Sequence, residues 1–240
     1  MNSGMKKILL ACVFTFVSLG ANAEFVAGDW KVEGDGLVTA DLDTGIEWLS
    51  LTQTRVMSFN QVSTLLSAEY AGWRLPTRAE VNGLMANITG LVTQENGQKG
   101  YSGSRSTYQR QAFDVIDVIG ETERQSHHSI ARGMYLNDDV QVEGEAQLLY
   151  SGAAARITNS SGTINIIYDD YPARVNDDFD TVDTGAGFFL VSDGGTTLLS
   201  LNNPTVNAQN ANAPADVPAP VLGSFAMFGL LLFGRRKLKA

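Results

Sequence analysis

The pattern of hydrophobic and polar residues predicts a strand early in the chain. Asp43-Thr44-Gly45 has the composition of a turn, and in the residues after it Ile46 and Trp48 alternate with Glu47 and Leu49. Such alternation puts the two sets on opposite faces of a half-buried strand. We therefore expect a strand from about residue 46 to residue 51.

Two helices are predicted directly after this strand. Ser58 and Gln61 have capping-box spacing, and apolar residues at helical spacing follow them, which indicates a helix over about 59–70. Thr77 and Glu80 form a second capping box. The apolar face of the second helix consists of Val81, Leu84 and Met85.

The second half of the chain predicts short strands between loops. Residues 92–112 are rich in Gly, Ser, Gln and Asn and suggest a long irregular loop, and residues 112–119 form a short apolar segment of uncertain type. Strand-like runs follow at 133–136, 155–157, 163–168 and 187–191. The order favours an α+β fold with two short helices and a small antiparallel sheet, in which Phe188 to Val191 pairs with the strand at Ile46.

Both ends of the chain have the composition of sorting signals. Lys6 and Lys7 precede an apolar stretch over 8–20, and Ala21 and Ala23 supply a small-x-small motif, so we expect residues 1–23 to be a signal peptide. A lipoprotein signal at Cys12 is the alternative, although few apolar residues precede that cysteine. Because Cys12 is the only cysteine, signal-peptide cleavage leaves an exported chain without disulfides.

Residues 217–240 predict a membrane anchor. An apolar run of 14 residues, 221–234, lies between Val217-Pro218-Ala219-Pro220 and the basic residues Arg235, Arg236 and Lys237. As a helix the run would span ~21 Å, against ~30 Å of hydrocarbon, so it requires a thinned bilayer and snorkelling basic residues. The basic cluster would lie in the cytoplasm and the rest of the chain outside it. A buried terminal helix is the alternative.

The composition of the chain between the two terminal signals indicates one folded domain followed by a spacer. Residues 194–216 contain no aromatic residue and almost no charge, so we expect a flexible linker there. Residues 24–193 have the size of one domain. Without the two signals, eleven Lys and Arg remain against 26 Asp and Glu, a net charge of about −15. Nucleic acids and polyanionic glycans are therefore unfavourable partners.

The C-terminal segment resembles the PEP-CTERM sorting signal of bacterial proteins associated with exopolysaccharide. The resemblance rests on Val217, Pro218, Pro220 and the terminal basic run, and it departs at Ala219, where the family has glutamate. It implies transient anchoring in the inner membrane, processing by an exosortase-type enzyme, and transfer to the cell envelope or extracellular matrix.

The folded part resembles the collagen-like adhesin C-terminal (Lcl-type) domain. The resemblance covers about 36–193 and rests on the segment around Trp48, on the W-R-L-P-T motif over 73–77 with Glu80, and on Phe189-Leu190-Val191. It implies a C-type-lectin-like fold. Its fold-signature residues are Trp48, Trp73, Arg74, Pro76, Thr77 and Glu80.

Several residues are candidates for a ligand-binding or calcium-binding site. Arg74 has the chemistry to hold a ligand carboxylate, but an ion pair to a nearby acid is favoured. Trp48 and Trp73 have the chemistry to stack on a sugar, but core packing is favoured. Asp177, Asp178, Asp180 and Asp183 are weak calcium candidates without EF-hand spacing, and a solvated loop is preferred.

His127 and His128 are the only histidines, and we expect them on a loop surface because no zinc-ligand spacing accompanies them. No catalytic motif is present, so we expect neither an enzyme nor a cofactor. We expect an exported protein that functions in binding or adhesion, with exopolysaccharide or a surface protein as its partner. A structural matrix component and, more remotely, a histidine-dependent hydrolase are the alternatives.

Overall fold

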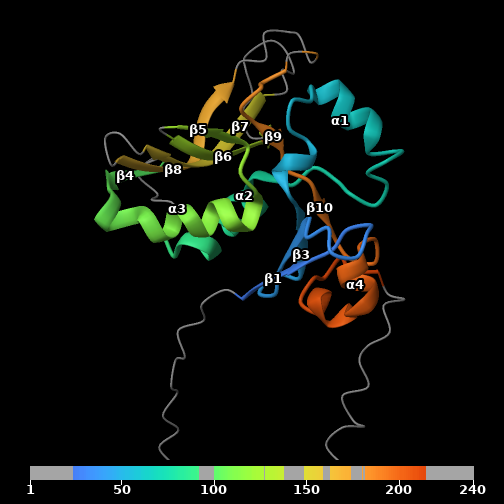
Figure 1. Cartoon of the computed structure of the whole chain (residues 1–240). Coiled ribbons are helices and arrows are strands. Elements are labelled where there is room, and N and C mark those ends of the chain that lie inside the picture. The colour runs from blue at the N-terminus through green and yellow to red at the C-terminus, as the bar shows by residue number, and fades with distance from the viewer. Residues whose placement is uncertain are drawn as a thin grey trace, which may run out of the picture.

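The computed structural model describes residues 24–91, 100–126, 128–137, 149–158, 163–173, 180 and 182–214 (Figure 1). The predicted signal peptide, the anchor, Asp177, Asp178 and His127 lie outside these residues. No helix of the described part is both long and apolar enough to cross a bilayer. The fold is α+β, as predicted, but the described residues contain four α-helices and two sheets instead of the expected two short helices and one small sheet.

Two antiparallel sheets form the framework. The first has the order β1-β2-β3-β10, and the second has the order β4-β8-β7-β6-β5, with β9 added in parallel to β6. The strands of the first sheet are β1 (Phe25–Gly28), β2 (Val38–Asp41), β3 (Ile46–Leu49) and β10 (Val191–Ser192). Those of the second are β4 (Gly100–Ser104), β5 (Glu123–Gln125), β6 (His128–Asn137), β7 (Leu149–Thr158), β8 (Thr163–Ala173) and β9 (Gly187–Phe188).

The segment from β9 to β10 passes from one sheet to the other. Phe188 pairs with Met134 of β6, whereas Val191 pairs with Trp48 of β3. Phe189 and Leu190 between them are almost completely buried, and the Phe189 ring meets Trp48 edge-on at 5.9 Å. The predicted pairing of this run with the strand at Ile46 is confirmed, and the run also joins the two sheets.

Both predicted capping boxes are present. The helices are α1 (Phe59–Leu65), α2 (Arg78–Thr89), α3 (Arg105–Ile119) and α4 (Leu198–Asn202), with single 3-10 turns η1 (Leu51–Gln53) and η2 (Pro204–Asn207). Ser58 caps α1 and Thr77 caps α2, each in a reciprocal box with Gln61 or Glu80. Helix α1 ends earlier than expected because the Tyr70 N–H bonds the Leu65 carbonyl, which closes the chain into a turn.

The prediction of a loop through 92–112 was wrong for its second part. Residues Gly100–Ser104 form β4, which pairs with β8. Residues from Arg105 form α3, which packs with α2 against the six-stranded sheet (Figure 1). Ala112, Val115, Ile116 and Ile119 are buried on the sheet side and explain why the helix forms. In its first turns Ser106, Thr107, Gln109 and Arg110 are exposed, so most of its buried apolar residues lie in its second half.

The predicted linker was also wrong where the structure describes it. Residues 194–214 fold onto the first sheet through α4 and η2. The buried Thr197 hydroxyl donates to Glu47 Oε1 at 2.6 Å, and Asn207 Nδ2 donates to the Gly45 carbonyl at 2.9 Å. Hydrogen bonds to distant parts of the chain therefore order a segment with little apolar surface, and the folded body extends past residue 193.

Candidate functional site

A shallow pocket of about 550 Å³ lies between the turn after η1 and one face of α1. Its apolar wall is formed by Val56, Met57 and Leu65, and its polar residues are Arg55, Asn60, Gln61 and Thr64. The residues of α1 come from one helix face because their spacing follows the helical repeat. The pocket thus combines an apolar surface with amide, hydroxyl and guanidinium groups.

Val56 at the edge of this pocket has a strained backbone. Its φ is +61°, and it is the only non-glycine residue of the described chain with a positive φ. The side chain is 49 % exposed, so burial of the side chain does not compensate for the strain. A β-branched residue in the left-handed region is unfavourable by about 1–2 kcal/mol. Such strain persists only where the surrounding structure holds it, and it concentrates at functional sites.

The turn carrying Val56 is fixed at both ends. The buried Thr54 hydroxyl donates to the Phe188 carbonyl at 2.7 Å and accepts the Phe188 N–H at 2.8 Å. On the other side the Ser58 N–H donates to Gln61 Oε1 at 2.8 Å, and the Ser58 hydroxyl accepts the Gln61 N–H. Asn60 Nδ2 donates to Asp180 Oδ1 at 3.0 Å, which places that predicted calcium candidate beside α1.

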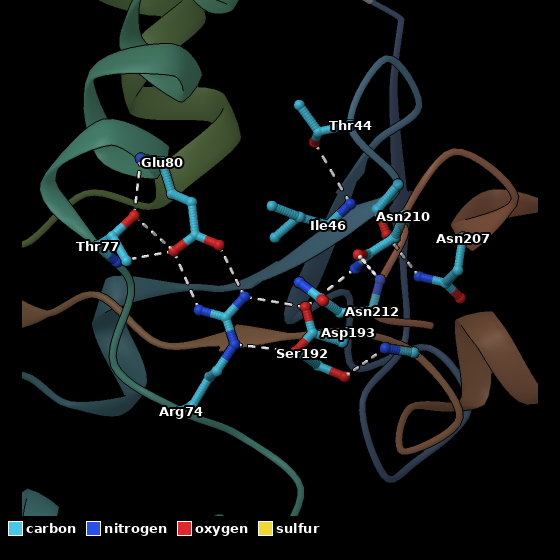
Figure 2. A network of polar contacts seen from close by, with 12 residues as sticks. Thr44, Ile46, Arg74, Thr77, Glu80, Ser192, Asp193, Asn207, Asn210 and Asn212 are labelled. Atoms are coloured by element: carbon cyan, nitrogen blue, oxygen red, sulfur yellow. Dashed lines mark hydrogen bonds and ion pairs between the residues drawn. The ribbon is translucent and has the colours of Figure 1, made fainter. Parts of the chain in front are cut away.

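Arg74 is the centre of a second polar group, a three-residue ion network with Glu80 and Asp193 (Figure 2). Nη1 and Nη2 donate to the two Glu80 oxygens at 3.0 and 2.7 Å, and Nε and Nη2 donate to the two Asp193 oxygens at 2.9 Å each. All three guanidinium nitrogens are engaged. The favoured interpretation of Arg74 as a loop-fastening ion pair is confirmed.

The network shifts the acidities of its members. The hydrogen bonds from Arg74 lower the pKa of Asp193 against the opposing effect of burial. Burial would raise the pKa of Glu80, but the hydrogen bonds from Arg74 and Thr77 outweigh it and lower that pKa. Both carboxylates raise the pKa of Arg74. Each group is therefore held in its charged form.

Glu47 is a buried carboxyl of β3 that no sequence signal singled out. It has no exposed surface, and it contacts the segment after β10 through Thr197. Burial raises its pKa, and hydrogen bonds from Thr197 and Ser200 partly oppose this. Its alternation with Trp48 in the sequence suggested an exposed residue, but α4 covers this face of the strand.

The predicted histidine loop is wrong for His128. This residue begins β6, is 8 % exposed, and places Nε2 3.2 Å from Glu123 Oε1. The hydrogen bond from His128 lowers the pKa of Glu123. Sequence reasoning missed this burial because the flanking residues are polar on both sides.

The remaining candidates are distributed over the fold. Asp183 Oδ1 accepts hydrogen bonds from Arg132 Nη2 at 2.9 Å and from the Gly185 N–H at 2.8 Å. Over the described ranges, no three His, Cys, Asp or Glu side chains are grouped so as to hold a metal ion. Trp48 and Trp73 are 3 % and 5 % exposed, so the prediction that they pack in the core is confirmed. The sequence contained no marker for the α1 pocket.

Comparison with known proteins identifies no relative: no family model, no curated protein and no solved structure matches this chain.

Proposed function

We propose that the chain is an exported binding protein that recognises a neutral saccharide of the surrounding exopolysaccharide through the α1 pocket. The proposal includes a C-type-lectin-like fold, transient anchoring by residues 221–234, and removal of the tail by an exosortase-type enzyme before transfer to the envelope or matrix. Its support in the sequence is the pair of resemblances at 36–193 and 217–239.

The size and the lining of the α1 pocket support this proposal. A volume of about 550 Å³ suits a small ligand, since ligand pockets commonly measure roughly 300–1,000 Å³. A sugar ring has an apolar C–H face and a rim of hydroxyls. Val56, Met57 and Leu65 match the first. For the second, Asn60 offers Oδ1, Gln61 offers Nε2 and Thr64 offers a hydroxyl lone pair, because Asn60 Nδ2, Gln61 Oε1 and the Thr64 hydroxyl proton already bind groups of the protein. The strained Val56 turn keeps these groups in place before a ligand arrives.

Electrostatics favours a neutral ligand. Without its two terminal signals the chain carries about −15, and Arg55 is the only cation lining the pocket. A polyanionic glycan would be repelled by this charge and would find no cluster of Lys and Arg. Arg74 offers no second cationic site because Glu80 and Asp193 occupy its guanidinium.

The proposal assigns no catalytic step. The hydrolase alternative requires an accessible histidine base, and the described histidine, His128, is buried beside Glu123. A base in that position would have to release its contact with Glu123 before it took a proton from a substrate.

The experiment is binding of the purified chain to a panel of neutral oligosaccharides, with and without calcium. Thr64→Trp fills the pocket and should weaken binding about tenfold or more, which corresponds to ~1.4 kcal/mol. Gln109→Trp, at an exposed position of α3, is the matched control and should bind like the parent. Equal affinity of all three chains would contradict the pocket assignment, and absence of binding would leave the structural matrix role.

A further inference from the structure

We infer that the face of the folded body formed by α4 and the loop over 29–36 lies against the membrane surface while the chain is anchored. The inference rests on the anchoring part of the proposed function. The observation behind it is that residues 194–214 are folded, so the expected flexible spacer is largely absent.

The length of chain outside the folded body sets the distance to the bilayer. The last hydrogen bonds of the body reach Asn212 and Ala213, and Pro214 is its exposed end. Six residues, 215–220, separate Pro214 from the apolar run at Val221. Six residues extend to at most about 20 Å, whereas a spacer beginning at residue 194 would allow about 90 Å.

The fold places α4 at the membrane end. Figure 1 shows α4 and β1 at one end of the body and α1 towards the other. The first turn of α4 is fixed to the loop after β1, because the Leu198 N–H bonds the Trp30 carbonyl and the Leu199 N–H bonds the Asp29 carbonyl. A short tether leaving from this end therefore holds α4 near the bilayer and leaves the α1 pocket facing outward.

This face carries exposed apolar side chains suited to the lipid interface. Val32 and Leu201 are 66 % and 62 % exposed, the two highest values among the exposed large hydrophobic residues of the described chain. Both belong to the elements joined by the Leu198 and Leu199 hydrogen bonds.

Apolar contact, rather than charge, would hold this face to lipid. Lys31 is already engaged over the Trp30 ring at 3.7 Å and by Glu69, and the neighbouring Asp29 and Asp35 carboxylates bind backbone N–H groups of their own loop. Two apolar side chains would not bind a vesicle alone. The short tether supplies the high effective concentration that makes a weak contact form.

The test uses residues 24–240, the chain expected after signal-peptide cleavage, which has no cysteine of its own, so that one introduced cysteine is the only thiol. Leu201→Cys, Val32→Cys and, as the distal control on α1, Thr64→Cys are each labelled with an environment-sensitive fluorophore. The proteins are reconstituted in phosphatidylcholine vesicles that contain nitroxide-labelled lipid. We expect a blue shift and strong quenching at positions 201 and 32 and neither effect at position 64.

A matched variant inserts about 20 Gly and Ser residues after Pro214, which gives a flexible tether. In this variant the quenching at position 201 should fall to that at position 64. Flotation with the vesicles measures anchoring separately. Chains that float but show equal quenching at all three positions would overturn the inference and leave anchoring intact, whereas chains that do not float would overturn both.

Discussion

Arg74 and Asp193 lie 119 residues apart in the chain and are joined by two parallel hydrogen bonds of 2.9 Å. Beside them the backbones of Arg74 and Val191 exchange two further hydrogen bonds, of 2.8 and 2.9 Å. The same guanidinium holds Glu80 at the start of α2. This arrangement fastens the connection between α1 and α2 to the end of β10.

Replacing Arg74 with lysine should destabilise the fold by about 2 kcal/mol. An ammonium cannot form two parallel pairs of hydrogen bonds, and the 35 % exposure of the Arg74 side chain reduces the effect below that of a fully buried pair. Urea unfolding measures the change. Arg110→Lys is the control, because Arg110 is 90 % exposed and pairs with Asp114 at 3.6 Å. An equal effect of the two substitutions would contradict a special role of the network.

Stability should fall in acid because of the same network. The pKa of Glu80 and that of Asp193 lie below their ordinary values of 4.5 and 3.8. The two carboxylates therefore stabilise the fold fully when the pH is above these ordinary pKa values. This stabilisation is lost as the pH falls through their lower pKa values in the folded state. Unfolding free energies measured between pH 6 and pH 2 in ~0.5-unit steps should show this loss. The double variant Glu80→Gln, Asp193→Asn should lose less stability over the same range, and an unchanged slope would argue against the assignment.

Glu47, in contrast, should make the fold less stable as the pH rises. Burial raises its folded pKa above the ordinary 4.5. The favourable contribution of Glu47 to folding stability is therefore complete below pH 4.5, and it is lost as the pH rises through the pKa of Glu47 in the folded state. Glu47→Gln should make the chain less sensitive to pH in that upper range, since the amide carries no charge and its oxygen can still accept the Thr197 hydrogen bond. Thermal unfolding at several pH values tests this, with the exposed Glu33→Gln as control; parallel curves for the two variants would refute it.

Val56→Gly should stabilise the fold and weaken ligand binding. Glycine adopts a φ of +61° without strain, which removes ~1–2 kcal/mol, and its added backbone entropy in the unfolded chain offsets ~0.5–1 kcal/mol of this gain. Binding should weaken because the turn loses its apolar side chain and becomes less rigid. Calorimetric unfolding and oligosaccharide titration measure the two effects.

Val32→Gly is the comparison for this variant, because Val32 is exposed and has no positive φ. It should destabilise the chain by ~0.5–1 kcal/mol. A Val56→Gly chain that loses as much stability as Val32→Gly would show that the turn stores no strain.

Local sequence patterns predicted the parts of the fold that depend on neighbouring residues. The two capping boxes depend on side chains three positions apart, and both are present. The alternation at β3 and the apolar run at 188–191 also identified two strands that pair. In the site region, Arg74 next to Trp73 and six residues before Glu80 was sufficient to suggest an ion pair, although Asp193 as its second partner was not foreseen.

The sequence by itself determined the starts of α1 and α2, the pairing of β3 with β10 and the acidic charge, because these follow from residue spacing and composition. Only the tertiary structure decided that residues 194–214 are folded, since their order comes from Glu47 and Gly45, which lie 150 and 162 positions from Thr197 and Asn207. It also decided the burial of His128 and the strained Val56 turn. The local composition of a segment does not show hydrogen bonds to distant residues. The positive φ of Val56 depends on the contacts between Thr54 and Phe188, and a valine at position 56 does not by itself indicate such an angle.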